Sequence, residues 1–156
     1  MFTALICLSA WLIVPFPGVP FTMQTFGVLL TLGVLGGRWG CISILLYLLM
    51  GVVGLPVFAG FRGGAGALLD ATGGFLWGFL LGALVYWILE RLGKLPAMAG
   101  CLAVTYLCGS WWFSRYAGLD LFSAMTVSVL PWLVPDAVKL ALASHIAKRI
   151  CKNIRI

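Results

Sequence analysis

Two opposite charges lie inside one of the most apolar stretches of the chain. Asp136 and Lys139 fall within "VLPWLVPDAVKLALASHIAK", three residues apart and therefore on one face of a helix. Pro135 precedes the acid and favours the first turn of a helix, near the positive end of the helix dipole. Because a buried charge in lipid costs several kcal/mol unless it is paired, we favour a ligand-binding pair. A proton relay and a purely structural ion pair stay open as alternatives.

Other polar side chains fall at predicted helix ends and in a glycine-rich segment. Gln24 offers two donors and an acceptor, and Thr22 either joins it in a site or caps the following helix. Arg62, in "AGFRGGAG", is the outer cation best placed to meet an anion, although a lone loop arginine is about as often a solvated surface charge. Asp70, together with Thr72, is expected to cap the next helix.

The composition indicates that the solvent of this protein is a lipid bilayer. Of the 156 residues, 63% are hydrophobic and 9% are charged, and the mean hydropathy is +1.13. A soluble domain carries about a quarter of charged residues. The net charge of +6 does not indicate nucleic-acid binding, because the basic residues are not gathered on one face. Many lie in residues 148–156, as in a basic cytoplasmic tail beside anionic lipid headgroups.

Glycine, proline and charge divide the chain into six predicted transmembrane helices within a single membrane domain, residues 1–156. The spans cover residues 2–16, 23–36, 41–55, 74–89, 97–113 and 124–150. Six spans put both termini on one side, and the excess of basic residues on that side predicts that it is cytoplasmic. The irregular segments "PFPGVPFT" and "VFAGFRGGAGALLDATGG" then face outward together. Irregular backbone at membrane depth is tolerated where it is buried or lines a cavity, so we expect an outward-facing ligand pocket.

Small residues recur every four positions in several spans. Gly74, Gly78 and Gly82 leave one face of the fourth span almost without side chains, and Gly33 with Gly37 does the same in the second. Such faces let helices approach closely in lipid. Packing within this chain is the favoured interpretation, and a docking face for a partner subunit is the alternative.

Motifs for other chemistry do not occur in the sequence. The glycine-rich "GFRGGAGALL" lacks the G-K-[ST] ending of a Walker A loop, so we expect no ATP site on this chain. The five cysteines are scattered and include no C-x-x-C pair. Neither an H-E-x-x-H motif nor a Ser-His-Asp set is present, so we expect no metal, no cofactor and no enzymatic activity.

Four segments follow one another in the order and spacing of a known family. "VPFTMQTFGVLLTLGVLG", "ISILLYLLMGVVGLPVFAGFRGG", "ATGGFLWGF" and "PDAVKLALASHIA" together resemble the BioY family, the biotin-specific S components of energy-coupling factor (ECF) transporters. The resemblance covers about residues 18–148, and its most specific pieces are "P-F-T-x-Q-T", "G-L-P-V-F-A-G" and "D-x-x-K". The chain departs from the family at residues 70–75, where "DATGGF" replaces G-P-T-G-G-Y. Phe75 therefore brings no aromatic hydroxyl, and the loop lacks the proline.

The resemblance implies an all-α integral membrane protein with six transmembrane helices and an outward-facing pocket for biotin. It also implies an assembly with a transmembrane T component and ABC-type ATPases. In such a pocket Asp136 accepts a hydrogen bond from a ureido N–H of biotin, and Lys139 donates to the ligand. A less favoured alternative is a membrane-embedded enzyme that uses these two residues as acid and base, and another is a purely structural subunit.

The remaining site residues follow from the same resemblance. Gln24 and Thr22 would complete the polar ring, and Arg62 would meet the carboxylate of biotin. Phe58 and Trp132 would supply apolar walls. The main alternative keeps this fold and changes the ligand to another small anionic vitamin or to a biotin precursor.

Overall fold

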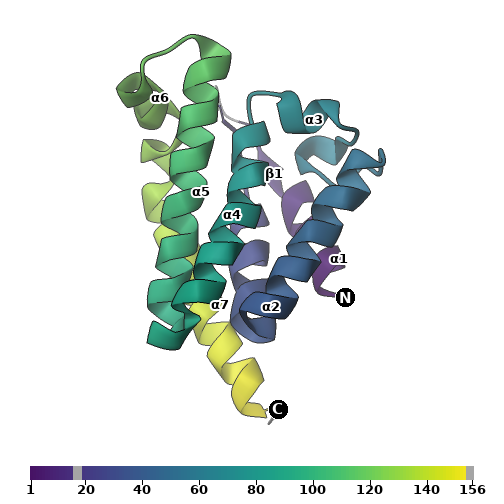
Figure 1. Cartoon of the computed structure of the whole chain (residues 1–156), viewed down its shortest axis with the longest axis vertical. Coiled ribbons are helices and arrows are strands. Elements are labelled where there is room, and N and C mark those ends of the chain that lie inside the picture. Colours follow the sequence, from purple (N-terminus) through teal and green to yellow (C-terminus); the bar gives the residue numbers. More distant parts are fainter. Residues whose placement is uncertain (16–18, 154–156) are drawn as a thin grey trace.

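Helices make up most of the chain in the computed structural model, which describes residues 1–15 and 19–153 (Figure 1). The helices are α1 (Phe2–Trp11), α2 (Gln24–Val52), α3 (Gly66–Leu69), α4 (Gly73–Leu89), α5 (Lys94–Ala117), α6 (Leu121–Ser128) and α7 (Leu133–Asn153). Short 3₁₀ turns occur at Ala59–Phe61, Glu90–Leu92 and Leu130–Trp132. Two strands, β1 (Ile13–Val14) and β2 (Phe21–Thr22), pair as an antiparallel hairpin with Ile13 opposite Thr22.

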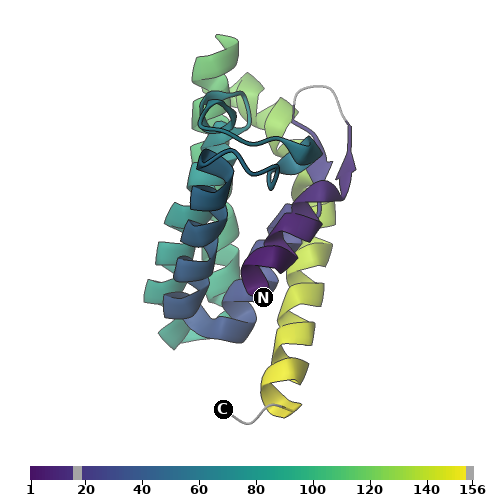
Figure 2. The ribbon, with the colours of Figure 1, turned by 90° about the vertical axis from the view of Figure 1, so that its right-hand side faces the viewer.

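Helix α2 consists of two arms that run in opposite directions. Gly36 joins them with φ +76° and ψ 174°. This backbone conformation is not helical, and its positive φ favours glycine. Leu32 and Gly40 are eight residues apart and would be separated by about 12 Å in a straight helix. A Cβ atom on Gly40 would instead lie only 3.2 Å from Cα of Leu32, so the chain folds back on itself between them. Figure 2 shows the chain turning at the lower end of α2 and running back upward. The turn falls at the "GGRWG" region, where the sequence predicts a break between two spans.

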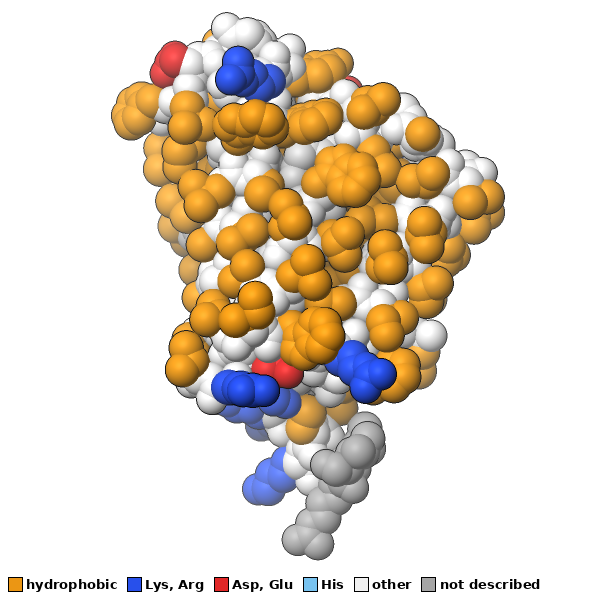
Figure 3. Space-filling view, in the orientation of Figure 1, with side chains coloured by type: hydrophobic (Ala, Val, Ile, Leu, Met, Phe, Trp, Pro, Cys, Tyr) orange, Lys and Arg blue, Asp and Glu red, His pale blue; other side chains and the backbone are white. Residues whose placement is uncertain are grey.

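The resulting bundle contains six helical segments, as the sequence predicts: α1, the two arms of α2, α4, α5 and α7. Within residues 1–15 and 19–153, three stretches are long and apolar enough to cross a membrane by length and composition, namely Gln24–Val52, Gly73–Leu92 and Leu121–Asn153. Helix α1 is a shorter apolar helix. Hydrophobic side chains cover the visible side of the bundle, and Lys and Arg side chains gather at its lower end (Figure 3). This distribution fits a protein whose sides face lipid.

The structure corrects the bounds of two predicted spans. The first helix ends at Trp11 rather than at residue 16, because the chain becomes extended in β1 before Pro15, and proline disfavours helix in the residue before it. The predicted span 124–150 is interrupted: α6 ends at Ser128, and α7 begins at Leu133. Pro131 lies in the interruption, where its missing N–H and its ring are incompatible with a continuous helix.

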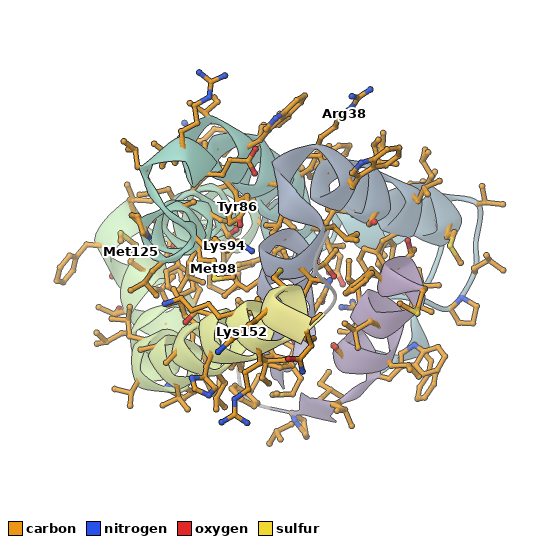
Figure 4. The ribbon with its side chains drawn as sticks, turned by 90° about the horizontal axis from the view of Figure 1, so that it is seen from below. Arg38, Tyr86, Lys94, Met98, Met125 and Lys152 are labelled. Atoms are coloured by element: carbon orange, nitrogen blue, oxygen red, sulfur yellow. The ribbon has the colours of Figure 1, made fainter. Side chains whose placement is uncertain are left out.

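The α2 turn is fastened by the connection between α4 and α5. The Nζ atom of Lys94 donates to the Gly33 carbonyl at 2.9 Å, and the backbone N–H of Gly37 donates to Oε2 of Glu90 at 2.7 Å. Seen from below, Lys94 points between the helices whereas Arg38 extends away from the bundle (Figure 4). The lower end of the bundle is thereby closed by side chains that satisfy backbone groups left free at a helix break.

Helices α4 and α5 pack closely because α4 presents glycines to its neighbour. A Cβ atom on Gly78 would lie 2.9 Å from Cα of Thr105, and one on Gly82 would lie 2.6 Å from the carbonyl oxygen of Cys101. The Thr105 hydroxyl in turn donates to the Gly78 carbonyl at 3.2 Å. The glycine face of the fourth span therefore packs against this chain's own fifth helix.

Replacing Gly82 with alanine is expected to destabilise the protein by about 1–3 kcal/mol, because the added methyl group meets the backbone carbonyl oxygen of Cys101 and two side-chain atoms of α5. Thermal unfolding in detergent measures the effect. Gly66→Ala is the matched control, since nothing lies within 4 Å of a Cβ atom at that position. Equal melting temperatures for the two variants would contradict the close packing of α4 on α5.

Candidate functional site

A cavity lies near the end of the bundle at which α2, α4 and α7 begin. Its wall includes every residue that the sequence predicts as a ligand contact: Thr22, Gln24, Phe58, Arg62, Trp132, Asp136 and Lys139. These residues come from β2, α2, the loop before α3, the 3₁₀ turn Leu130–Trp132 and the first turns of α7, so more than a hundred residues of chain separate the first from the last. The bundle brings them to one cavity, which is the kind of concave, mixed apolar and polar site that binds small molecules.

The ion pair predicted within the last span is formed and buried. Nζ of Lys139 lies 2.6 Å from Oδ1 of Asp136, and each side chain is only 5% exposed. Asp136 stands in the first turn of α7, as Pro135 predicts, so the partial positive charge of the helix start stabilises its carboxylate. A buried pair of this kind is retained only when further hydrogen bonds satisfy both charged groups.

Those further hydrogen bonds come from two other elements. The hydroxyl of Tyr106, on α5, donates to Oδ2 of Asp136 at 2.6 Å. The ammonium of Lys139 donates to the backbone carbonyl of Thr22 at 2.7 Å and lies 3.8 Å from the centre of the Phe21 ring. The pair on α7 is therefore held between α5 and the β1–β2 hairpin, with both charged groups at the cavity wall.

Gln24 is held in place by the second arm of its own helix. Its Nε2 donates to the hydroxyl of Tyr47 at 2.9 Å, and that hydroxyl donates to the Val57 carbonyl at 3.2 Å. Tyr47 is fully buried, and its ring meets Phe58 edge to face with centroids 5.4 Å apart. The orientation of the Gln24 amide at the cavity wall thus depends on the folding back of α2.

Of the two sequence interpretations of Thr22, a place in the cavity wall agrees with the structure, and capping of α2 does not. The N-cap of α2 is Met23, without a side-chain hydrogen bond, so Thr22 does not cap the helix. Its backbone carbonyl instead accepts from Lys139, and the residue lines the cavity.

Arg62 lines the cavity and is tied into its own loop. Its Nη1 forms an ion pair with Asp70, its Nη2 donates to Oγ1 of Thr72 at 3.2 Å, and its Nε donates to the Ala59 carbonyl at 3.2 Å. The backbone N–H of Ala71, and then the Arg62 guanidinium, hold the pKa of Asp70 below its usual value, against an opposing effect of partial burial. The expected capping of α4 by Asp70 is wrong, because Thr72 is the N-cap and has no side-chain cap bond.

Aromatic rings form much of the apolar wall. Phe58 is 1% exposed, and Trp132 packs against Phe21 with ring centroids 5.3 Å apart. Phe75 and Phe79, on the first turns of α4, complete this wall. Phe58 and Trp132 therefore both lie in the cavity wall.

Sequence reasoning missed Tyr106 and Phe21 as parts of the site. A tyrosine inside an apolar span is a usable signal, because a buried phenol hydroxyl needs a hydrogen-bond partner. The spacing of Tyr106 from Asp136 carries no such information, since they lie thirty residues apart on different helices. Among the described residues, no group of three His, Cys, Asp or Glu side chains is placed to hold a metal ion, and the five cysteines are free.

The burial of Asp136 and Lys139 leads to a prediction about the stability of variants that lack one or both charges. Replacing Lys139 alone with methionine leaves the Asp136 carboxylate buried without its cation and is expected to cost about 3–5 kcal/mol. Replacing both residues, Lys139→Met with Asp136→Leu, removes both charges and should cost less than the single change. Thermal unfolding of the ligand-free protein in detergent compares the two variants. A double variant less stable than the single one would mean that the pair stabilises the fold more than its burial costs.

This chain is similar to known proteins in both sequence and structure. The BioY family model matches residues 1–156. The biotin transporter BioY of Thermotoga maritima is 40% identical, covering 97% of this chain and 92% of that protein, and the probable biotin transporter BioY of Pyrococcus horikoshii is 38% identical, covering 98% and 93%. The crystal structure of an S-component for biotin from an ECF-type ABC transporter superposes with a TM-score of 0.88 at 26% identity, covering 97% of this chain and 87% of that chain. The resemblance seen in the sequence is therefore confirmed, and this chain belongs to the BioY family, a family of transport proteins rather than enzymes.

Proposed function

We propose that this chain is the substrate-capture subunit of a biotin importer. It binds biotin in the cavity near the start of α7 and presents it for uptake driven by separate transmembrane T and ATPase subunits. The observation that carries the proposal is the convergence of an apolar aromatic wall with one buried ion pair, Asp136 and Lys139. Relatives named as biotin transporters and the fold shared with a biotin S-component support the choice of ligand.

The chemistry of the site suits the parts of biotin. The ureido group has two N–H donors and a carbonyl acceptor, and the site offers a carboxylate acceptor on Asp136 and an ammonium donor on Lys139. Tyr106 donates a hydrogen bond to one carboxylate oxygen of Asp136. This bond fixes the orientation of the carboxylate, and with it the direction of the remaining lone pairs. Charge-assisted hydrogen bonds of this kind are about twice as strong as neutral ones, which favours tight capture.

The rest of the ligand fits the remaining wall. The apolar bicycle of biotin packs against Phe58 and Trp132, whose rings lie at the cavity wall. Gln24 and Thr22 supply polar atoms beside them, and Arg62 lies where the loop meets the cavity and is assigned to the carboxylate end. No cofactor is needed for this capture step, because binding and release change no covalent bond.

The second candidate keeps the same site and changes the ligand to another small anionic vitamin or a biotin precursor. The mostly aromatic wall favours a ligand with a compact apolar body, which dethiobiotin and lipoate also have in part. Competition at equal concentration separates these cases: displacement of labelled biotin by either compound would refute specificity for biotin.

The position in the membrane follows from charge. Lys and Arg side chains gather at the end of the bundle that carries the α2 turn and the end of α7, opposite the cavity (Figure 3, Figure 4). Cytoplasmic ends of membrane helices carry the excess of Lys and Arg. We therefore assign both termini to the cytoplasm and the cavity to the outer side.

The binding proposal is tested with the isolated chain and the variant Asp136→Asn. The substitution removes the charged acceptor and leaves Lys139 buried without its anion, so the Kd for biotin should rise by at least about thirtyfold, which corresponds to about 2 kcal/mol. Equilibrium dialysis with labelled biotin measures this change. Asp120→Asn is the matched control, since Asp120 is exposed at the start of α6, lies outside the cavity, and asparagine also caps helices. Unchanged affinity in Asp136→Asn would remove the pair from the ligand site.

The orientation has its own test. A fluorescent protein fused after residue 156 should fluoresce in cells, and an alkaline phosphatase fused at the same place should be inactive, because the first folds in the cytoplasm and the second only outside it. A fusion to the loop that holds Arg62 should behave in the opposite way. Active phosphatase at the C-terminus would reverse the proposed orientation.

A further inference from the structure

Both cations at the cavity wall already have an acid of their own. The charged residues that line the cavity are Arg62, Asp136 and Lys139, and Lys139 is paired with Asp136. Arg62 is paired with Asp70, which does not line the cavity. Within the part of the chain that the structure describes, the cavity and its border thus hold two positive and two negative groups. A ligand carboxylate entering this cavity meets no uncompensated positive charge.

Asp70 borders a hollow beside the cavity and not the cavity itself. A shallow hollow next to the cavity is lined by Arg62, Asp70 and Tyr116 among others. Arg62 belongs to both the hollow and the cavity, whereas Asp70 belongs only to the hollow. A carboxylate in the cavity and the carboxylate of Asp70 would therefore approach the same guanidinium from two sides.

Each nitrogen of the Arg62 guanidinium already donates one hydrogen bond. Nε donates to the Ala59 carbonyl, Nη1 to Asp70, and Nη2 to the Thr72 hydroxyl. Asp70 is itself fixed by the backbone N–H of Ala71 at 2.7 Å, which keeps its carboxylate facing the arginine. The lowered pKa of Asp70 keeps this carboxylate ionised at neutral pH. A ligand carboxylate must either displace Asp70 or share Arg62 with it, and two carboxylates held close together repel each other.

We propose that Asp70 is a specificity-determining residue that neutralises Arg62, so that this site binds neutral derivatives of biotin, esterified or amidated at the carboxyl group, almost as well as biotin itself. The inference rests on the proposed function and adds to it the class of ligand: the ureido bicycle is recognised strongly and the carboxylate weakly. Asp70 contacts Arg62 and does not touch the ligand. It acts by removing the charge that would otherwise select an anion.

The test is a ratio of two affinities measured on the full chain in detergent. Equilibrium dialysis gives the Kd of biotin methyl ester divided by the Kd of biotin, for the parent and for Asp70→Asn. The parent ratio is expected to be below about tenfold. Asparagine keeps the shape and removes the charge, so the ratio should rise by about three- to fivefold, the size expected for an exposed ion pair.

Two further variants separate the role of Asp70 from general effects. In Arg62→Ala combined with Asp70→Asn, the gain in preference for biotin should disappear, because Asp70 acts through Arg62. Asp120→Asn, with the same charge change on the exposed start of α6, should leave the ratio at its parent value. A ratio in Asp70→Asn within twofold of the parent, or a gain that survives the loss of Arg62, would overturn the proposal.

A measurement on the unmodified protein needs no variant to fold. Because the Arg62–Asp70 pair is neutral, the ratio for the parent should stay constant between about 0.02 and 0.5 M salt, whereas a free exposed arginine would lose its preference for the anion as screening increases. A ratio that falls steeply with salt would overturn the proposal. If the parent binds neither compound, the proposed function fails together with this inference, but biotin binding with an unresponsive ratio removes only the role of Asp70.

Discussion

The buried ion pair of Asp136 and Lys139 is the interaction around which the cavity-containing half of the bundle is arranged. Two charges that are each 5% exposed require hydrogen bonds on every side, and these come from Tyr106 on α5 and from the Thr22 carbonyl in the hairpin. The first turns of α7, the middle of α5 and the β1–β2 hairpin are therefore held in one place. A cavity wall with fixed polar groups follows from this requirement, because the groups that satisfy the pair are the ones that line the cavity.

The backbone groups outside regular helix are hydrogen-bonded differently at the two ends of the bundle. At the lower end, the α2 turn leaves backbone groups without helical partners, and Lys94 and Glu90 bind them, so that end is closed. At the cavity end, the chain is irregular on both sides of α2, and its backbone is satisfied by loops, short turns and the Arg62 side chain. Close packing of the glycine face of α4 on the backbone and side chains of α5 joins the two ends.

Much of the fold and site could be predicted because lipid imposes strict rules on sequence. Apolar spans, their breaks at glycine and proline, and the small-residue faces are visible residue by residue, and so is the anomaly of two charges within a span. The errors are local. The first helix ends at Trp11, earlier than predicted. The last predicted span is interrupted at Pro131, although the residues on both sides of the interruption are similarly apolar. Composition cannot distinguish a helix from an apolar extended strand over so few residues.

The sequence by itself determined the solvent, the helical class, the family resemblance and the presence of two opposite charges three residues apart within a span, because each depends on residue type and short spacing. Only the tertiary structure decided which distant residues meet. Tyr106 reaches Asp136 across thirty residues, and Asp70 turns toward Arg62 instead of capping α4. The physical reason is that partners of a polar group are chosen by the relative position of whole helices and loops. Such positions are set by packing over the entire chain, not by the residues adjacent to either partner.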